Sequence, residues 1–464
     1  MIDKQKTIKS SVTVSGVGLH TGQTVTLSFK PAAENTGIQF VRTDLETPVV
    51  IEADADYVVD TSRGTTLEKD GVRLLTVEHV LAAITGLDID NVIVEVDCQE
   101  MPIMDGSSRF YVEALQKAGI EQQEAPREYF EIKDTIRFYD PEKDCEFIAV
   151  PADQYRISCM IDYNSKVLGS QYATLDNLAD FHKEIAPCRT FVFLHELEYL
   201  LKQNLIKGGD LSNAIVYVDR PVEQNELDRL AELFNKPSVA VRTEGILNNL
   251  EPYFENEAAR HKLLDIVGDL TLAGVRIKGQ LIARKPGHAS NVKFAREIKK
   301  EIKKRKAEEM IPHHDPDQQP LYNINDITKM LPHRYPFLLV DKIIEMSESH
   351  VVGVKNITMN ESYFTGHFPS EPVLPGVLQI EAMAQTGGIL ILSTVDDPEN
   401  YSTYFMKIDN VKFKQKVIPG DTLIMKCSLI SPVRRGICHM RCVGYVGSKI
   451  VIEAELMAQI ARNK

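Results

Sequence analysis

Residues 259–270 read ARHKLLDIVGDL and combine two helical periodicities. The apolar stripe of this predicted helix consists of Leu263, Ile266, Val267 and Leu270. His261, Asp265 and Asp269 recur every four residues on another face. At this spacing a surface ion pair is more common than a metal site. The second face is therefore either a solvated stripe or half of a metal site whose other ligands come from elsewhere.

Composition narrows the class of protein. The chain has 464 residues, enough for two to four domains, with 43% hydrophobic and 26% charged residues. A net charge of −13 argues against nucleic-acid binding, because phosphates require a basic face. We find no apolar run near the ~20 residues of a membrane span, no secretory signal and no CxxC pair among the seven cysteines. We expect a cytoplasmic protein with reduced thiols and at most peripheral membrane contact.

A change in composition predicts the main domain boundary. Residues 296–306 (REIKKEIKKRK) carry seven basic and two acidic side chains, and residues 311–320 (IPHHDPDQQP) contain three prolines. This is typical of a solvated helix followed by a linker that includes His313 and His314. The predicted parts are two β–α subdomains at 1–126 and 127–305, a linker at 306–320, and a final domain at 321–464.

A second short helix offers further metal ligands. TVEHVLAAITG (76–86) places Glu78 and His79 side by side. Zinc binds imidazole nitrogen and carboxylate oxygen, and a catalytic site keeps one position open beside three protein ligands. With His79 as the third ligand, Glu78 is a candidate general base beside the metal-bound water. His288, which follows a predicted strand, is a candidate general acid.

Eight motifs occur in order along the first 300 residues. They are GVGLHTG (16–22), TSRGTTL (61–67), TVEHVLAA (76–83), MDGSS (104–108), CRTF (188–191), KGGDLSNAIV (207–216), RHKLLDIVGDL (260–270) and KPGHASN (285–291). Together they resemble the zinc-dependent UDP-3-O-acyl-N-acetylglucosamine deacetylases of lipid A synthesis. The resemblance implies two similar α/β layers that face one another, an acylated UDP-sugar substrate and one zinc per site. Two histidines and one aspartate accept iron as well.

The resemblance also implies a role for each matching residue. The expected zinc ligands are His79, His261 and Asp265. Glu78 would activate the bound water, and the Thr190 hydroxyl would stabilise the oxyanion together with the metal. His288 would protonate the departing amine, and Asp269 would orient His288. Lys262 would place a positive charge near the site.

Three positions depart from expected patterns. Cys188 stands where the family commonly has Ala, and we interpret it as a packing residue, since a fourth ligand would displace the water. Pro286 replaces a small polar residue and stiffens its loop. Thr21 occupies a position where the dinucleotide fingerprint needs Gly, so we expect no nicotinamide cofactor.

A different pattern begins at Leu321. PGVLQIEAMAQTGGILILS (375–393) predicts one long apolar helix, and strand-like runs follow it. A buried helix wrapped by an antiparallel sheet is the economical interpretation. The helix carries Glu381, fourteen residues after His367 in a Gly–His–Phe–Pro turn. A buried carboxylate needs either a local partner, such as an Arg or a backbone donor, or a catalytic task.

Four motifs of this half resemble the hot-dog-fold 3-hydroxyacyl-[acyl-carrier-protein] dehydratases. They are LPHRYPFLLVDKI (331–343), GHFP (366–369), PGVLQIEAMAQ (375–385) and FKQKVIPGDTL (413–423). The resemblance implies His367 as the base, Glu381 as the acid, and backbone N–H groups near Gly376 that polarise the thioester carbonyl. It also implies acyl carrier protein as a partner, no cofactor, sites shared between the two subunits of a dimer, and assembly of dimers into hexamers.

The expected fold class is α+β, with two similar α/β layered subdomains followed by a hot-dog domain. The leading functional hypothesis is a bifunctional deacetylase and dehydratase whose fusion couples lipid A synthesis to fatty-acid elongation. The alternatives are a scaffold that binds ligand without turnover, and a generic amidohydrolase joined to a thioesterase. The complete set of expected catalytic residues in both halves favours the bifunctional enzyme.

Overall fold

The computed structural model describes residues 3–463 except 203–206, 209–210, 212, 235, 237 and 244. The chain divides into two compact units, Met1–Ile302 and Lys303–Lys464. No helix of the described residues is long and apolar enough to cross a membrane. The finer subdomain bounds expected at residues 126 and 305 stay predictions.

The first unit begins with a five-stranded sheet. Its strands, in spatial order, are β2 (Val12–Val17), β3 (Thr24–Pro31), β9 (Val92–Val96), β4 (Ile38–Arg42) and β5 (Val49–Glu52). Val25, Leu27 and Phe29 alternate along β3 and bury one face of the sheet. Only β4 and β9 are parallel neighbours, and the chain between them includes helix α1 (Glu78–Gly86). Smaller elements of this half are β1 (Lys4–Ile8) paired with β10 (Ile120–Pro126), the sheet of β6 (Val58–Asp60), β7 (Thr66–Lys69) and β8 (Val72–Leu74), and helix α2 (Arg109–Ala118).

A second sheet repeats this arrangement. Its strands are, in order, β12 (Ile136–Asp140), β13 (Cys145–Val150), β18 (Arg276–Arg284), β14 (Tyr155–Asp162) and β15 (Ser170–Leu175), with β11 (Tyr129–Glu131) also paired to β18. β14 and β18 are parallel, and the chain between them includes helix α6 (Glu257–Thr271). Inserted before α6 are α3 (Phe181–Glu184), β16 (Phe191–Phe193), α4 (Leu194–Lys202), β17 (Ile215–Tyr217) and α5 (Gln224–Leu233). The repeat confirms the predicted pair of similar α/β layers.

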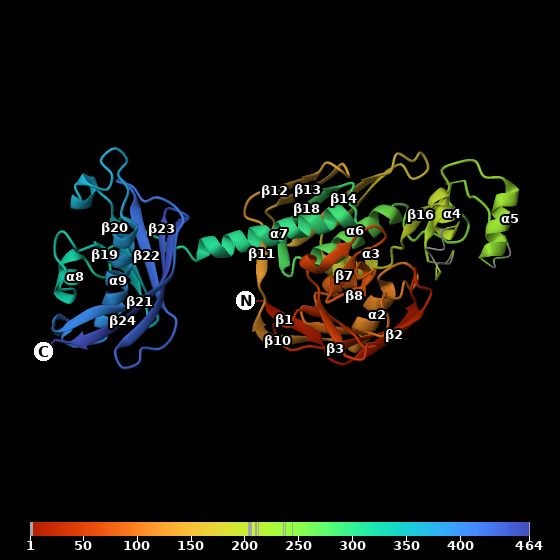
Figure 1. Cartoon of the computed structure of the whole chain (residues 1–464). Helices are drawn as coiled ribbons and strands as arrows, with labels where there is room; N and C mark the ends of the chain where they lie inside the picture. The colour runs from red at the N-terminus through yellow and green to blue at the C-terminus, as the bar shows by residue number, and fades with distance from the viewer. Residues whose placement is uncertain are drawn as a thin grey trace. The chain divides into compact units, whose positions relative to one another are not determined.

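Helices α6 and α7 (His288–Glu309) lie between the two sheets of the first unit, whereas α4 and α5 lie to one side of these sheets (Figure 1). The first part of helix α7 covers the inner face of the second sheet, where Phe294 stacks on Phe147 with ring centroids 4.6 Å apart. This helix continues to Glu309, so the first residues of the predicted linker are helical. The layers are also joined by charge, because Arg276 of β18 donates to Asp90 at 3.1 Å in the other half.

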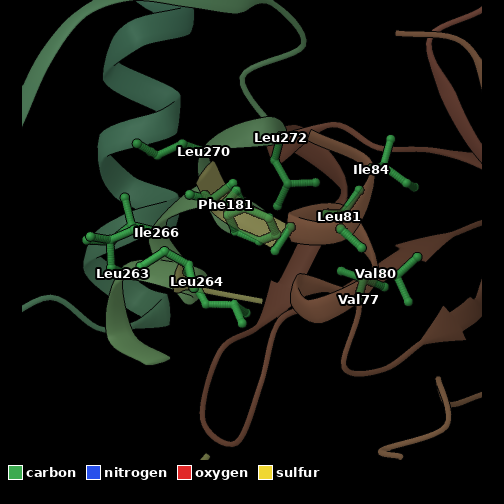
Figure 2. Packing of buried hydrophobic residues seen from close by; sticks show 14 of the residues in the cluster. Val77, Val80, Leu81, Ile84, Phe181, Leu263, Leu264, Ile266, Leu270 and Leu272 are labelled. Atoms are coloured by element: carbon green, nitrogen blue, oxygen red, sulfur yellow. The ribbon is translucent and has the colours of Figure 1, made fainter. Parts of the chain in front are cut away.

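Helices α1 and α6 pack against each other at the centre of the unit. The side chains of Leu81 and Leu264 belong to this contact, and Phe181 packs beside them (Figure 2). The approach is closest at Gly268, where an added Cβ would lie 2.1 Å from the backbone oxygen of Glu78. The two helix backbones therefore meet with no room for a side chain at this point.

The second unit is a hot-dog fold, as predicted. Helix α9 (Gly376–Leu392) packs against an antiparallel sheet ordered β19 (Lys342–Met346), β20 (His350–Asn356), β22 (Thr422–Leu429), β23 (Ile437–Val446), β24 (Lys449–Arg462) and β21 (Tyr401–Phe413). An added Cβ on Gly353 of β20 would lie 2.6 Å from the Thr386 hydroxyl, so strand and helix approach closely. A short helix, α8 (Ile324–Met330), precedes the sheet. Ile311, in the predicted linker, packs beside Val352 and Ile424 in a second apolar cluster of this unit.

Substitution at the helix contact tests this packing. We expect Gly268→Ala to lower the melting temperature, since overpacking a dense interface costs about 1–3 kcal/mol. The matched control is Gly388→Ala on α9, where the nearest atoms would lie 3.9 Å from the added Cβ. That change should be neutral or stabilising, because Ala favours a helix over Gly by about 1 kcal/mol. Differential scanning calorimetry measures both, and an unchanged melting temperature for Gly268→Ala would contradict the close contact.

Candidate functional site

Three side chains of metal-ligand type meet where α1 packs against α6. His79 comes from α1, and His261 and Asp265 come from successive turns of α6. One candidate ligand atom from each lies within 4.8 Å of the others, and all three residues are buried. The Nε2 atoms of His261 and His79 are 3.4 and 3.8 Å from Asp265 Oδ1. The sequence placed two of these residues on one helix face, and the helix contact brings the third to them.

This triad fits a divalent cation. Asp265 Oδ1 is buried and has no hydrogen-bond partner among the described residues, which is costly for a carboxylate oxygen unless a cation faces it. His261 Nδ1 donates to the backbone oxygen of Cys188 at 3.0 Å, which leaves Nε2 with a free lone pair. Burial lowers the pKa of His261, and it lowers the pKa of His79 to about 3, so both imidazoles are neutral. Two neutral imidazoles and one carboxylate form a donor set suited to catalytic zinc.

Glu78 lies beside the triad with its two oxygens in different surroundings. The Thr65 N–H donates to Oε2 at 2.9 Å, whereas Oε1 lies 4.0 Å from His288 Nε2. Burial raises the pKa of Glu78 to about 7, with Asp269 and Asp265 adding to the increase and His288 opposing it. A carboxylate that titrates near neutral pH is suited to accept a proton from water.

His288 is held as a cation beside both Glu78 and the triad, with its Nε2 3.8 Å from Asp265 Oδ2. It begins α7, and its Nδ1 donates to Asp269 Oδ2 at 3.0 Å, an oxygen that also accepts from Asn291 at 2.8 Å. Burial disfavours the imidazolium, yet the carboxylates of Asp269, Asp265 and Glu78 raise the pKa of His288 to about 9. His288 therefore carries a proton at neutral pH and can donate it from Nε2.

Lys262 and Thr190 lie around the same centre. Lys262 Nζ donates to Asp265 Oδ2 at 2.9 Å and lies 5.7 Å from the centre of the Phe191 ring. Burial opposes the charge of this amine, but the Asp265 carboxylate raises the pKa of Lys262 above its usual range. Thr190 directly precedes β16, and its N–H donates to the Gly106 carbonyl at 2.8 Å. Its hydroxyl makes no hydrogen bond with the described residues, so it is available to a ligand.

Some contacts at this centre were not predicted from the sequence. Thr65 and Asn291 belong to the quoted motifs TSRGTTL and KPGHASN, but their spacing alone suggested no role. Gly64 is needed where it stands, because its φ is +144° and an added Cβ would lie 2.8 Å from Glu78 Oε1. Cys188 is buried, and its thiol donates to the Glu184 carbonyl at 3.4 Å, which is consistent with its interpretation as a packing residue. In the motif KGGDLSNAIV, positions 209, 210 and 212 lie outside the described residues.

The residues expected to catalyse in the second unit, His367 and Glu381, have different polar partners within one chain. His367 Nδ1 donates to the Val373 carbonyl at 2.8 Å. Glu381 Oε1 accepts from Gln385 at 2.9 Å and lies 3.5 Å from His333 Nε2. Across the described residues, His367 and Glu381 share neither a hydrogen bond nor an ion pair.

The start of α9 lies next to an exposed apolar edge. An added Cβ on Gly376, the first residue of α9, would lie 2.6 Å from the Phe413 ring. Phe413 belongs to β21, which is an edge strand of the sheet. Exposed apolar side chains on this strand include Tyr404 (62%), Met406 (51%) and Phe413 (54%). The N–H groups of Gly376 and Val377, which make no hydrogen bond with the described residues, thus lie beside an apolar edge strand.

Comparisons with known proteins match both units. The family model described as UDP-3-O-acyl N-acetylglycosamine deacetylase (LpxC) matches residues 5–236 and 223–300, and that of the FabA-like domain matches residues 331–455. The chain is 50% identical over 461 residues to the bifunctional enzyme LpxC/FabZ of Bacteroides thetaiotaomicron, covering 99% of this chain and 100% of the relative. It is 49% identical to the bifunctional enzyme LpxC/FabZ of Porphyromonas gingivalis over 463 residues, covering 100% of both. The UDP-3-O-acyl-N-acetylglucosamine deacetylase of Myxococcus xanthus is 42% identical over 295 residues, covering 63% of this chain and 86% of the relative.

The ionisation of Glu78 and His288 predicts a bell-shaped pH dependence for hydrolysis at the triad. Glu78 must be ionised to accept a proton, so kcat/KM should rise with pH through a pKa of about 7. A bound cation lowers this pKa, which moves the acidic limb toward lower pH. His288 must be protonated to donate, so the rate should fall as pH rises through a pKa of about 9. Initial rates between about pH 5 and pH 10 measure both limbs. An alkaline limb that persists in His288→Gln would contradict this assignment.

Proposed function

This chain belongs to the family of bifunctional LpxC/FabZ enzymes, and from this premise we propose the roles of its site residues and the assembly of its copies. The first unit hydrolyses the N-acetyl group of UDP-3-O-acyl-N-acetylglucosamine in lipid A biosynthesis. The second dehydrates 3-hydroxyacyl-[acyl-carrier-protein] to the trans-2-enoyl product in fatty acid biosynthesis. No observation favours the scaffold or the amidohydrolase–thioesterase alternative.

One observation carries the deacetylase proposal, namely the buried triad of His79, His261 and Asp265 with an acid and a base beside it. We assign the triad to one Zn²⁺ ion, and the same donors accept Fe²⁺. When bound, the ion supplies Lewis-acid chemistry that lowers the pKa of water and polarises the acetamide carbonyl.

The surrounding side chains then move the protons. Glu78 accepts the proton of the attacking water through Oε1, since Oε2 is held by the Thr65 N–H. The Thr190 hydroxyl and the Lys262 ammonium stabilise the negative charge that develops on the carbonyl oxygen. His288 donates its Nε2 proton to the departing amine, and Asp269 orients the ring throughout. The products are acetate and the free amine.

The dehydratase proposal needs one base and one acid and no cofactor. His367 donates from Nδ1 to the Val373 carbonyl, which leaves Nε2 free to remove the C2 proton of the substrate. Glu381 protonates the C3 hydroxyl, which leaves as water. The first-turn N–H groups at Gly376 polarise the thioester carbonyl. Gln385 donates to Glu381 and holds its carboxyl group in place.

We further propose that two copies complete each dehydratase site. Among the described residues His367 and Glu381 share no hydrogen bond or ion pair, and the apolar edge strand β21 offers a surface for a second copy. Pairing through this unit would bring the base of one subunit to the acid of its partner. Such dimers can assemble further into hexamers.

The substrates suggest where the enzyme works. We place it in the cytoplasm, with at most peripheral contact between the first unit and the membrane, because its sugar substrate carries an acyl chain. The fusion would keep two enzymes that act on 3-hydroxyacyl groups at equal abundance. This supports the proposal that it couples lipid A synthesis to fatty-acid elongation.

Metal removal separates the two activities. Thorough chelation should abolish acetate release and leave enoyl formation unchanged, and added Zn²⁺ should restore the former. We expect Glu78→Gln to remain inactive after zinc is restored, because it lacks the base. Glu113→Gln, on an exposed part of α2, is the matched control and should behave as wild type. Acetate release that survives metal removal would contradict the assignment of the triad.

Mixing two inactive variants tests the shared dehydratase site. We expect His367→Asn and Glu381→Gln to be inactive alone. If equal amounts of the two variants exchange subunits at random after co-refolding, about half of the dimers are mixed. Each mixed dimer holds one intact site, made of the His367 of one subunit and the Glu381 of the other, so about one quarter of wild-type activity should return. Enoyl formation measured across mixing ratios gives the result. If mixed dimers form but show no enoyl formation, a site built from two copies is contradicted.

A further inference from the structure

We propose that Thr65 is a positioning residue. Through two hydrogen bonds it fixes the general base, Glu78, relative to Asp269, which is the partner of the general acid. The inference rests on the deacetylase roles proposed above for Glu78, Asp269 and His288. It concerns a residue that forms no hydrogen bond with the triad among the described residues and has no proposed contact with the substrate.

Two atoms of Thr65 hold groups on different helices. Its N–H donates to Glu78 Oε2 on α1 at 2.9 Å, and its hydroxyl donates to Asp269 Oδ1 on α6 at 2.5 Å. All three residues are buried, and Thr65 has no exposed surface. Because the covalent geometry of one residue separates the two donors, Thr65 fixes the distance between the two carboxylates.

The two hydrogen bonds of Thr65 determine which oxygen of Glu78 and which oxygen of Asp269 is left to face His288. With Oε2 of Glu78 occupied, Oε1 is the oxygen that faces His288 Nε2 at 4.0 Å. With Oδ1 of Asp269 occupied by Thr65, Oδ2 receives both His288 and Asn291. Three donors thus fix the plane of the Asp269 carboxylate, and that plane sets the tilt of the His288 ring.

The local sequence suits this task. Gly64 leaves room for Glu78 Oε1, and the next residue supplies the N–H for Oε2, so the pair encloses the carboxylate. A buried hydroxyl is costly unless it is bonded, and Thr65 donates to a charged acceptor. The β-branched side chain also restricts χ1, which keeps the hydroxyl directed at Asp269. Without the hydroxyl, both remaining donors of Asp269 would lie on one oxygen, and the group could rotate.

Thr65→Val tests the inference, because it keeps the shape and removes the donor. We expect kcat for acetate release to fall about 10- to 100-fold, as for loss of a hydrogen bond to a charged group, with KM changed less than about twofold. Bound metal should stay near its wild-type level, whereas the melting temperature should fall modestly, because the buried Asp269 Oδ1 loses its donor. Thr65→Ser should recover most of the loss. Thr66→Val is the control, since the Thr66 hydroxyl makes no hydrogen bond with the described residues, and enoyl formation by the same chain reports the amount of enzyme.

A double-mutant cycle identifies the route of the effect. In an Asp269→Asn background, Thr65→Val should lower kcat less than about threefold, because the hydroxyl then acts on a group already impaired. Thr65→Ala repeats the test should the valine variant fold poorly. Three results would each overturn the inference. They are an unchanged kcat in Thr65→Val, a loss of bound metal in proportion to the loss of activity, and no recovery of kcat in Thr65→Ser. A wild-type chain without acetate release would overturn the proposed function as well, whereas an active wild type with an unaffected Thr65→Val variant overturns the inference alone.

Discussion

The close contact between α1 and α6 is the constraint on which the first unit depends. Gly268 has no side chain to hold the helices apart. Asp265 lies almost one turn before it on α6, and Asp269 follows it directly. At the far end of the pair, the hydroxyls of Thr85 and Thr271 lie 2.6 Å apart. Fixed at both places, α1 presents its first turn to the middle of α6. The residues that occupy these turns then form the triad that we propose binds the metal, with the proposed base and acid beside it.

Burial and neighbouring charges shift the pKa values of the titratable groups at this centre in different directions. Burial keeps the two ligand histidines neutral, as metal binding requires. The same burial raises the pKa of Glu78 to about 7, while three carboxylates raise the pKa of His288 to about 9. One environment thus produces a base that is ionised and an acid that is protonated in the same range of pH. Such separation of acid and base by their surroundings is a recurrent feature of hydrolytic sites.

The parts of the account that depend on local patterns could be predicted from the sequence. The four-residue spacing of His261 and Asp265 and the adjacency of Glu78 and His79 supplied all three candidate ligands and the candidate base. The apolar helix before a run of strands predicted a helix packed against an antiparallel sheet, and the resemblance of four motifs to the dehydratases implied the hot-dog fold. Ile311 was not predicted, because a single apolar residue among prolines has no periodicity to interpret, yet it packs in the second unit.

Contacts between distant segments could not be predicted in this way. The hydroxyl of Thr65 and the carboxylate of Asp269 are 204 positions apart in the chain, and no local spacing relates them. Likewise, the fourteen-residue spacing of His367 and Glu381 does not say that the two groups have different polar partners in one copy. Both features depend on how distant elements of the chain pack, which local spacing does not determine.

The central claim is that α1 and α6 together form a zinc site, and anomalous X-ray diffraction from crystals of the zinc-loaded chain tests it most directly. Data collected just above and just below the zinc absorption edge locate the metal without reference to activity. We expect one anomalous peak per chain, about 2.0–2.2 Å from ligand atoms of His79, His261 and Asp265. We expect no peak at the dehydratase site. A zinc peak elsewhere in the chain, with none at these three residues, would contradict the claim.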